Sequence, residues 1–132
     1  MARWLFKEEP TSFSFKKLMK DGQVKWDGIA NPVALKNLRQ VKKGDEIFFY
    51  ETGKIKAVVG IMKAAADAVQ GKTPSDVSVL VKPVEPLKQA VTLAQVKATP
   101  ELKEWELARI SRLSIMPVTE NQWRRVLAMA SD

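Results

Sequence analysis

The chain has 132 residues, of which 45% are apolar and 28% charged, values typical of a single globular domain and unlike those of a disordered chain. It contains no cysteine and no histidine. That composition excludes zinc sites built on those residues, thiol nucleophiles, haem ligation and a Ser-His-Asp triad. Only carboxylate, Lys, Tyr or hard-metal chemistry remains. We expect one domain over residues 1–132, with no cofactor and no metal.

The formal charge is +7, and it is unevenly distributed along the chain. Residues 1–63 hold 13 Lys/Arg and 7 Asp/Glu, whereas residues 64–132 hold 9 and 8. A basic excess of this size favours polyanions, although solubility alone accounts for it equally well. No apolar run approaches the roughly 20 residues that span a bilayer, and the first residues lack the layout of a secretory signal. We expect a cytoplasmic monomer without membrane contact.

The first elements are a strand and a short helix. Residues 2–7 alternate imperfectly around Trp4 and Phe6, and Pro10 ends the pattern. Residues 11–14 form a turn with capping potential before a helix over 15–20, which Asp21-Gly22 ends. The predicted buried face of this helix consists of Phe15, Leu18 and Met19.

Residues 26–50 supply a turn, a helix and a buried strand in one continuous run. Trp26-Asp27-Gly28 is typical of a turn, and Asn31-Pro32 suits the N-cap and first position of a helix that extends to Val41. The segment 42–45 ends that helix with two lysines and a glycine. Residues 46–50 have the β-branched and aromatic content of a buried strand.

Two further strands follow. The polar segment 51–54 predicts a hairpin that returns as a strand over 55–64, in which Gly60 indicates a bulge or a close backbone approach. Residues 70–76 form a polar loop, and a strand over 77–84 follows with valines at every second position. We expect Glu85-Pro86-Leu87 to close that strand.

The last third is mainly helical. A short helix over 91–97 is capped by Thr92, and a second begins at Thr99-Pro100-Glu101 and extends toward Ile110. Residues 111–118 alternate as a strand with Pro117 at an edge. Thr119 and Gln122 have capping-box spacing at the start of a final helix, whose buried residues are Trp123, Val126, Leu127 and Met129.

These elements predict an α+β fold. There is no regular strand-helix-strand alternation and no glycine-rich phosphate loop, so an open parallel sheet is disfavoured. We expect a PUA-like, partly closed β-barrel with short flanking helices outside it.

Five blocks of sequence, in the same order, resemble those of the EVE domain family. They are residues 4–10, 26–31, 44–50, 59–61 and 112–119, so the similarity covers nearly the whole chain. The resemblance implies a PUA-like barrel related to YTH and ASCH domains. It also implies a non-catalytic reader that binds DNA or RNA carrying a modified base.

Two of the five blocks depart from the family pattern. The first block usually reads Lys-Ser-Glu-Pro, and here Glu8 replaces the hydroxyl residue. The second usually continues with Arg-Asn-Tyr-Gln, and here it reads Ala30-Asn31-Pro32-Val33. Both changes alter the charge and hydrogen-bonding groups beside the expected pocket, so the resemblance implies the fold more directly than the ligand.

Trp26 is the first candidate for the base pocket, because a Trp beside a turn can offer its ring face to a planar base. The alternative is that Trp26 plugs one end of the barrel. We expect the other three tryptophans, Trp4, Trp105 and Trp123, to lie in the core. Asn31 can read a base edge or cap the helix, and a carboxylate can accept an exocyclic amine of a base. The full predicted pocket is Lys7, Glu8, Glu9, Trp26, Ile29, Ala30, Asn31, Tyr50, Arg112, Leu113 and Ser114.

Lys36, Arg39, Lys42 and Lys43 are the candidate phosphate contacts, since they lie on or just after the central helix. The alternative for them is an ordinary solvated face. Two other functions stay open at this point: a protein-interaction module with a basic surface, and a small hydrolase that uses two of Glu8, Glu9, Asp27 and Glu51.

Overall fold

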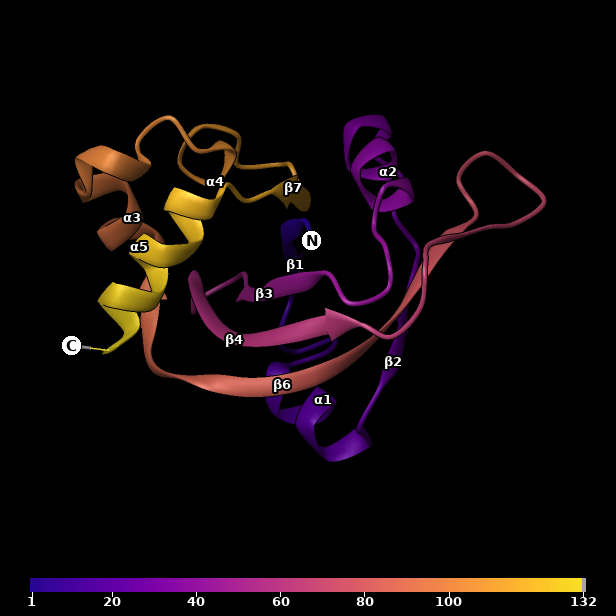
Figure 1. Cartoon of the computed structure of the whole chain (residues 1–132), viewed down its shortest axis with the longest axis horizontal. Helices are drawn as coiled ribbons and strands as arrows, with labels where there is room; N and C mark the ends of the chain where they lie inside the picture. Colours follow the sequence, from indigo (N-terminus) through magenta and orange to yellow (C-terminus); the bar gives the residue numbers. More distant parts are fainter. Residues whose placement is uncertain (132) are drawn as a thin grey trace.

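The computed structural model describes residues 1–131 (Figure 1). The strands are β1 (Arg3–Glu8), β2 (Val24–Trp26), β3 (Glu46–Glu51), β4 (Ala57–Ala64), β5 (Val69–Gln70), β6 (Val77–Thr92) and β7 (Ile115–Pro117). The helices are α1 (Phe15–Asp21), α2 (Pro32–Arg39), α3 (Leu93–Ala98), α4 (Glu106–Arg109) and α5 (Glu120–Ser131), with a 3-10 turn at Pro100–Leu102.

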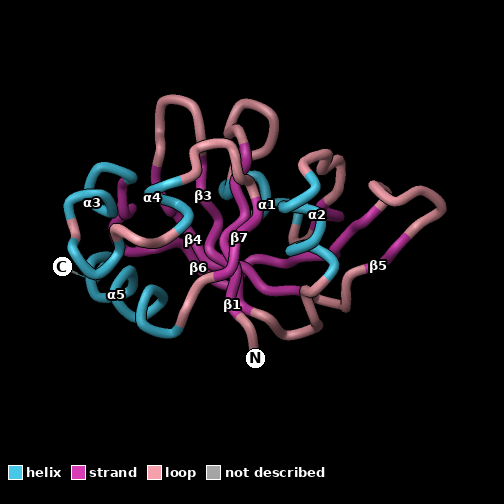
Figure 2. The backbone as a smooth tube through the Cα atoms, turned by 90° about the horizontal axis from the view of Figure 1, so that it is seen from above, coloured by secondary structure: helices cyan, strands magenta, loops and turns pink. Residues whose placement is uncertain are grey.

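The strands form one curled sheet in the order β2-β6-β4-β3-β1-β7, a half-barrel that confirms the predicted architecture. β1 and β3 are parallel, with Arg3 opposite Glu46 and Glu8 opposite Glu51, and the other pairs are antiparallel. Helices α3, α4 and α5 gather on one side of the sheet, whereas β5 and the start of β6 project from the opposite side as a hairpin (Figure 2).

An aromatic cluster fills the concave side of the sheet. The Trp26 ring lies 5.3 Å from Phe6 and 5.5 Å from Phe49, measured between centroids, and Phe13 meets its edge at 6.5 Å. Phe15 of α1 packs on Phe49 at 5.4 Å. Gly60 allows this packing, because a Cβ there would lie 2.4 Å from the Phe15 ring. The predicted close approach at Gly60 is thus confirmed, and the β3–β4 and β4–β6 registers also shift beside it.

Several predicted helix boundaries are confirmed by their caps. Asn31 Oδ1 accepts from the backbone N–H groups of Val33 and Ala34, so the asparagine is the N-cap of α2. Thr92 caps α3 in a complete capping box with Gln95. Thr119 and Gln122 exchange the same pair of hydrogen bonds at the start of α5, at 3.1 and 2.8 Å.

The prediction that residues 85–87 close a strand is wrong, because β6 continues to Thr92. The prolines at 83 and 86 lack the backbone N–H groups that would donate to the neighbouring strand. The register shifts near Gly60 and Met62 accommodate these two prolines. The predicted polar loop 70–76 likewise begins inside a short strand, since β5 pairs with the start of β6.

The helix predicted to run from Pro100 toward Ile110 is interrupted at Trp105. The backbone of Trp105 is extended (φ −68°, ψ 140°), and its fully buried indole donates to the Pro117 carbonyl at 3.3 Å. Burial of the indole therefore takes precedence over helical continuity. The strand predicted over 111–118 is also shorter, at 115–117, because residues 111–112 form a turn.

Met19 is 46% exposed, which corrects its predicted burial. Phe15 and Leu18, three positions apart, already fill the narrow buried face of α1. The other predicted core tryptophans, at positions 4, 105 and 123, are at most 5% exposed.

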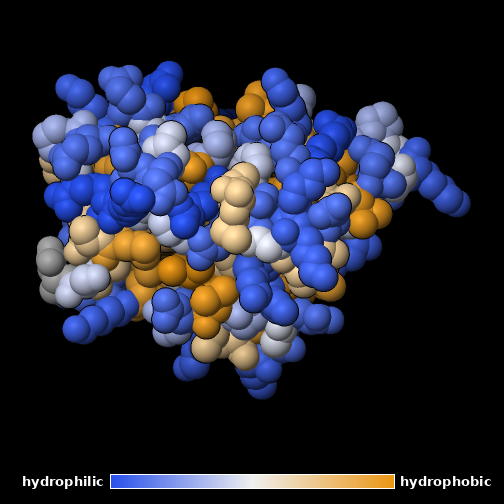
Figure 3. Space-filling view, in the orientation of Figure 1, coloured by the Kyte–Doolittle hydropathy of each residue, from blue (hydrophilic) through white to orange (hydrophobic). Residues whose placement is uncertain are grey.

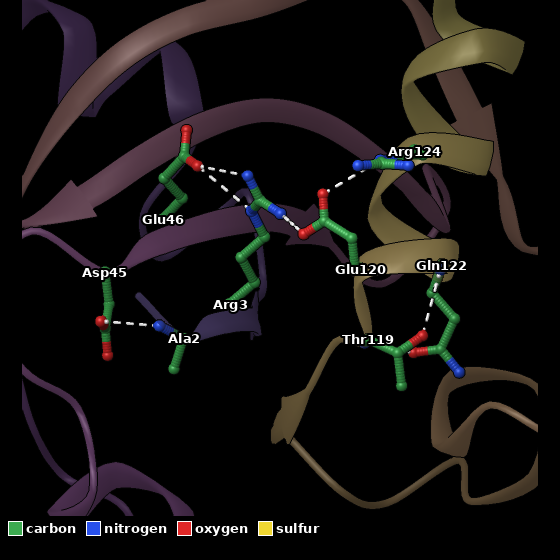
Figure 4. Close-up of polar contacts among 8 residues, drawn as sticks. All are labelled: Ala2, Arg3, Asp45, Glu46, Thr119, Glu120, Gln122 and Arg124. Atoms are coloured by element: carbon green, nitrogen blue, oxygen red, sulfur yellow. Dashed lines mark hydrogen bonds and ion pairs between the residues drawn. The ribbon is translucent and has the colours of Figure 1, made fainter.

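Arg3 joins the start of β1 to β3 and α5. Its guanidinium donates to Glu46 and pairs with Glu120, which also accepts from Arg124 at 3.1 Å (Figure 4). The same guanidinium lies 4.9 Å from the centre of the Trp123 ring, and that ring stacks on Phe48 at 3.8 Å. These contacts fix α5 on the side of the sheet opposite the Trp26 cluster.

Hydrophilic side chains cover much of the face shown in Figure 3, with an apolar band where α5 meets β4 and β6. A shallow depression in that region is lined by Ile61, Pro86, Leu87 and Leu127 among others. Within residues 1–131, none of the helices is both long and apolar enough to cross a bilayer.

Candidate functional site

The end of β1 separates the predicted pocket residues into two groups. Neighbouring side chains of a strand point to opposite faces of its sheet, and Lys7 and Glu8 are such neighbours. Lys7 and Tyr50 line a cavity of about 520 Å³ on the helical side, beside α3 and α4. Glu8 and Trp26 line a cavity of about 170 Å³ on the side of α1 and β2. We call these the basic cavity and the Trp26 cavity.

The Trp26 cavity lies over the end of β2. Trp26 is the last residue of that strand; it is only 4% exposed and packs against three phenylalanine rings, and it is also one of the residues that border the cavity. The remaining lining residues are Phe13, Val24, Lys25 and Asp27. The packing role considered for the indole is confirmed, and its contact with a base stays a prediction.

Glu8 offers this cavity a free carboxylate oxygen. Its Oε1 accepts from the Glu9 N–H at 3.0 Å, and within residues 1–131 its Oε2 makes no hydrogen bond. Glu9 is engaged differently, because its carboxylate accepts from the hydroxyls of Thr11 and Thr52 at 3.3 Å. Glu9 therefore ties the β1–α1 loop to the β3–β4 turn.

The segment after Trp26 does not extend the cavity. Ile29 is half-buried against the core, while Ala30 and Asn31 are exposed and line neither cavity. The Asn31 oxygen is occupied by its two cap hydrogen bonds, which leaves its Nδ2 amide for other partners.

Two of the predicted pocket residues, Lys7 and Tyr50, line the basic cavity, and burial shifts their pKa values in opposite directions. Desolvation lowers the pKa of the Lys7 amine below 10.5 and raises the pKa of the Tyr50 phenol above 10.0. The Lys7 amine donates to the Ser111 carbonyl at 3.1 Å and lies 5.5 Å from the centre of the Tyr50 ring.

The late block 112–114 lies beside the end of β1 but does not join the Trp26 cavity. The Lys7 N–H donates to the Ser114 carbonyl at 2.8 Å, which places this segment against β1. Leu113 is buried, Arg112 is exposed and Ser114 is half-buried. Neither Arg112 nor Ser114 lines either of the two cavities.

The four predicted phosphate contacts are exposed on or just after α2. Arg39 is held by the hairpin of β5 and β6, because its guanidinium donates to Gln70 Oε1 at 3.0 Å and to the Pro74 carbonyl at 2.5 Å. Lys36, Lys42 and Lys43 form no ion pair within residues 1–131.

The carboxylates considered for hydrolysis are held by different hydrogen-bond and ion-pair partners. Glu51 accepts from the Phe15 N–H at 2.9 Å and so helps to begin α1, and Glu9 is held by the two threonines. Asp27 borders the Trp26 cavity with Glu8, but it lies 4.0 Å from the Lys25 amine. Two of the four are therefore engaged in holding loops.

Sequence reasoning missed several lining residues. Phe13 and Lys25 border the Trp26 cavity, and Lys56, Lys97 and Arg109 border the basic cavity. Strand alternation would place Lys25 and its neighbour Trp26 on opposite faces, so it could not have predicted that both border one cavity. Nothing local brings the residues at 56, 97 and 109 together. They meet only because α3 and α4 fold over the end of β3.

Comparison with known proteins places this geometry in a family context. The family model described as "EVE domain" matches residues 2–129. Human thymocyte nuclear protein 1 is 28% identical over an alignment of 165 positions, which covers 97% of this chain and 73% of the human protein.

Solved structures of similar proteins share the fold over almost the whole chain. The protein Rpa0253 of Rhodopseudomonas palustris superposes with a TM-score of 0.93 at 34% identity, covering 99% of this chain and 94% of that one. Human THYN1 in complex with 5-methylcytosine-containing DNA gives a TM-score of 0.93 at 27% identity, covering 100% and 99%. An ASCH protein of Zymomonas mobilis, at 14% identity and a TM-score of 0.65, shares the fold alone and covers 97% and 95%.

Proposed function

Because the chain belongs to the EVE domain family, we propose that it binds DNA carrying a modified cytosine, as a non-catalytic reader that accepts the base in the Trp26 cavity. The observation that carries this proposal is the pairing of an aromatic border with an unengaged carboxylate oxygen on Glu8 in one small cavity. The human relative's structure with 5-methylcytosine DNA supports DNA, rather than RNA, as the ligand.

The chemistry of the cavity suits a cytosine. A carboxylate accepts a hydrogen bond from the cytosine N4 amine, whereas thymine presents the O4 acceptor at the same place and has no hydrogen to donate. An aromatic ring against the base contributes about 1–3 kcal/mol, which offsets the few kcal/mol needed to extrude a base from the stack. A 5-methyl group would then meet the apolar lining of Phe13 and Val24.

The phosphate backbone would be held by the basic N-terminal half. Lys36, Lys42 and Lys43 have no acidic partner in the described chain, and Arg39 is fixed on the hairpin beside them. Each phosphate neutralised by a cation releases counterions, so the affinity should fall as salt is raised. This contribution is independent of sequence and of modification.

Fluorescence anisotropy with labelled duplexes tests the proposal. One duplex carries a single 5-methylcytosine, its match carries cytosine, and an RNA of the same sequence is a third arm. The native chain should bind the methylated duplex more tightly. Glu8→Gln should weaken that binding roughly tenfold, because a charged acceptor is replaced by an amide that can present its donor side.

Asp21→Asn is the matched control, since it removes the same charge from an exposed position on α1. Removal of a negative charge favours non-specific DNA binding, so a selective loss in Glu8→Gln cannot be a charge effect. Equal affinity of the native chain for the two duplexes would refute the proposed base preference.

A further inference from the structure

The basic cavity contains four cationic side chains and no carboxylate among its lining residues. Lys7 comes from β1, Lys56 from the turn before β4, Lys97 from the last turn of α3 and Arg109 from the end of α4. Four separate elements thus direct positive charge to one concave site of about 520 Å³, a size within the range of about 300–1,000 Å³ for small-molecule pockets.

None of these four cations is neutralised within residues 1–131. The ion pairs of that region involve other residues. The Lys7 amine donates to the Ser111 carbonyl, and the Arg109 guanidinium donates to the Glu104 carbonyl at 3.2 Å. Both acceptors are uncharged, so neither contact neutralises a cation.

Tyr50 adds an unengaged donor to the same cavity. The residue is 3% exposed and lines the cavity, yet its hydroxyl makes no hydrogen bond with any residue of the described chain. The hydroxyl oxygen is not among the fully buried unpaired polar atoms of the described chain, so it is open to the cavity and can donate to an acceptor that a ligand supplies. A cationic cavity with a free phenol selects a ligand rich in acceptor oxygens.

We propose that the basic cavity is a phosphate-binding site in which the Tyr50 hydroxyl and the four cations hold one phosphate group. The apolar lining residues Leu93 and Leu107 would contact the body that carries the phosphate. The phosphate can come from a free nucleotide or from the DNA backbone. The site lies on the opposite face of the sheet from the Trp26 cavity, so it does not depend on the base pocket.

Protein-observed NMR titration tests this site with three probes: deoxycytidine 5′-monophosphate, deoxycytidine and the unmethylated duplex. The backbone amides of Thr52, Gly53 and Ser111 report on the cavity. We expect saturable shifts with the monophosphate and none with the nucleoside. If the DNA backbone is the natural source, the duplex moves the same amides and the monophosphate competes with it. If the source is a free nucleotide, only the monophosphate moves them.

Three variants make the test specific. Tyr50→Phe should weaken monophosphate binding roughly tenfold and leave the melting temperature unchanged, because the lost hydroxyl has no partner in the protein. The double variant Lys97→Gln/Arg109→Gln should weaken it further. Lys16→Gln/Lys20→Gln removes the same charge from α1, outside the cavity, and should bind as the native chain does.

Absence of saturable shifts with both the monophosphate and the duplex would overturn the site. So would equal losses of affinity in the two double variants, because that result would indicate only a general charge effect. Either failure would leave untouched the methylcytosine preference measured with the native chain and Glu8→Gln.

Discussion

At the residue scale, the single tyrosine of the chain gives a direct measure of the basic cavity. Burial raises the pKa of Tyr50 above 10.0. The folded chain therefore keeps the phenol proton more strongly than the unfolded chain does. The stability that this contributes is complete below pH 10.0 and is lost as the pH rises through the folded pKa.

Ultraviolet titration of phenolate absorbance reports on this group alone. We expect a midpoint above 10.0 in the native chain and a midpoint at 10.0 after unfolding in urea. A native midpoint at or below 10.0 would show that the phenol is not desolvated as the structure describes.

Residue-scale predictions from the sequence succeeded where the decisive interaction is local. The caps at Asn31, Thr92 and Thr119 depend on partners two or three residues away, and all three are present. The distribution of Lys7 and Glu8 over two cavities depends on strand alternation, which could have been applied to the predicted strand. Lys56, Lys97 and Arg109 come together at one cavity through tertiary packing, which no local sequence pattern indicates.

At the scale of elements, α1 packs on the sheet because Gly60 has no side chain and so leaves room for the Phe15 ring. A Cβ at Gly60 would lie 2.4 Å from the Phe15 ring, a distance that real Cβ contacts do not show. Gly60→Ala should therefore lower the free energy of unfolding by about 1–3 kcal/mol through overpacking.

Urea unfolding measures the loss, and a double-mutant cycle identifies its cause. Phe15→Leu shortens the opposing side chain, so Gly60→Ala should cost much less in that background. An equal cost in both backgrounds would show that the ring of Phe15 does not occupy the space above Gly60.

Element types were predicted better than element ends. Strands β1, β3 and β4 and helices α1, α2 and α5 were predicted from their residue patterns and boundary residues, and the structure contains them within a few residues of the expected bounds. The errors arise where tertiary contacts override local signals. Burial of Trp105 interrupts a predicted helix, and register shifts let β6 continue past its prolines.

At the scale of the whole molecule, the half-barrel places two chemically different cavities on opposite faces of one sheet. The Trp26 cavity is small, aromatic and acidic at Glu8, whereas the basic cavity is larger and cationic. The fold was predictable because five blocks of sequence occur in family order. The presence of two cavities on opposite faces could be recognised only from the three-dimensional arrangement of the sheet.

The central claim is that a modified base enters the opening beside Trp26, and indole N–H signals in NMR test it most directly. The chain has four tryptophans, and those at positions 105 and 123 lie outside the Trp26 cluster as internal references. A duplex with one 5-methylcytosine should shift the Trp26 signal at saturation and leave those two in place, while the cytosine duplex shifts it less. A Trp26 signal that stays unchanged when the methylated duplex is fully bound would contradict the claim.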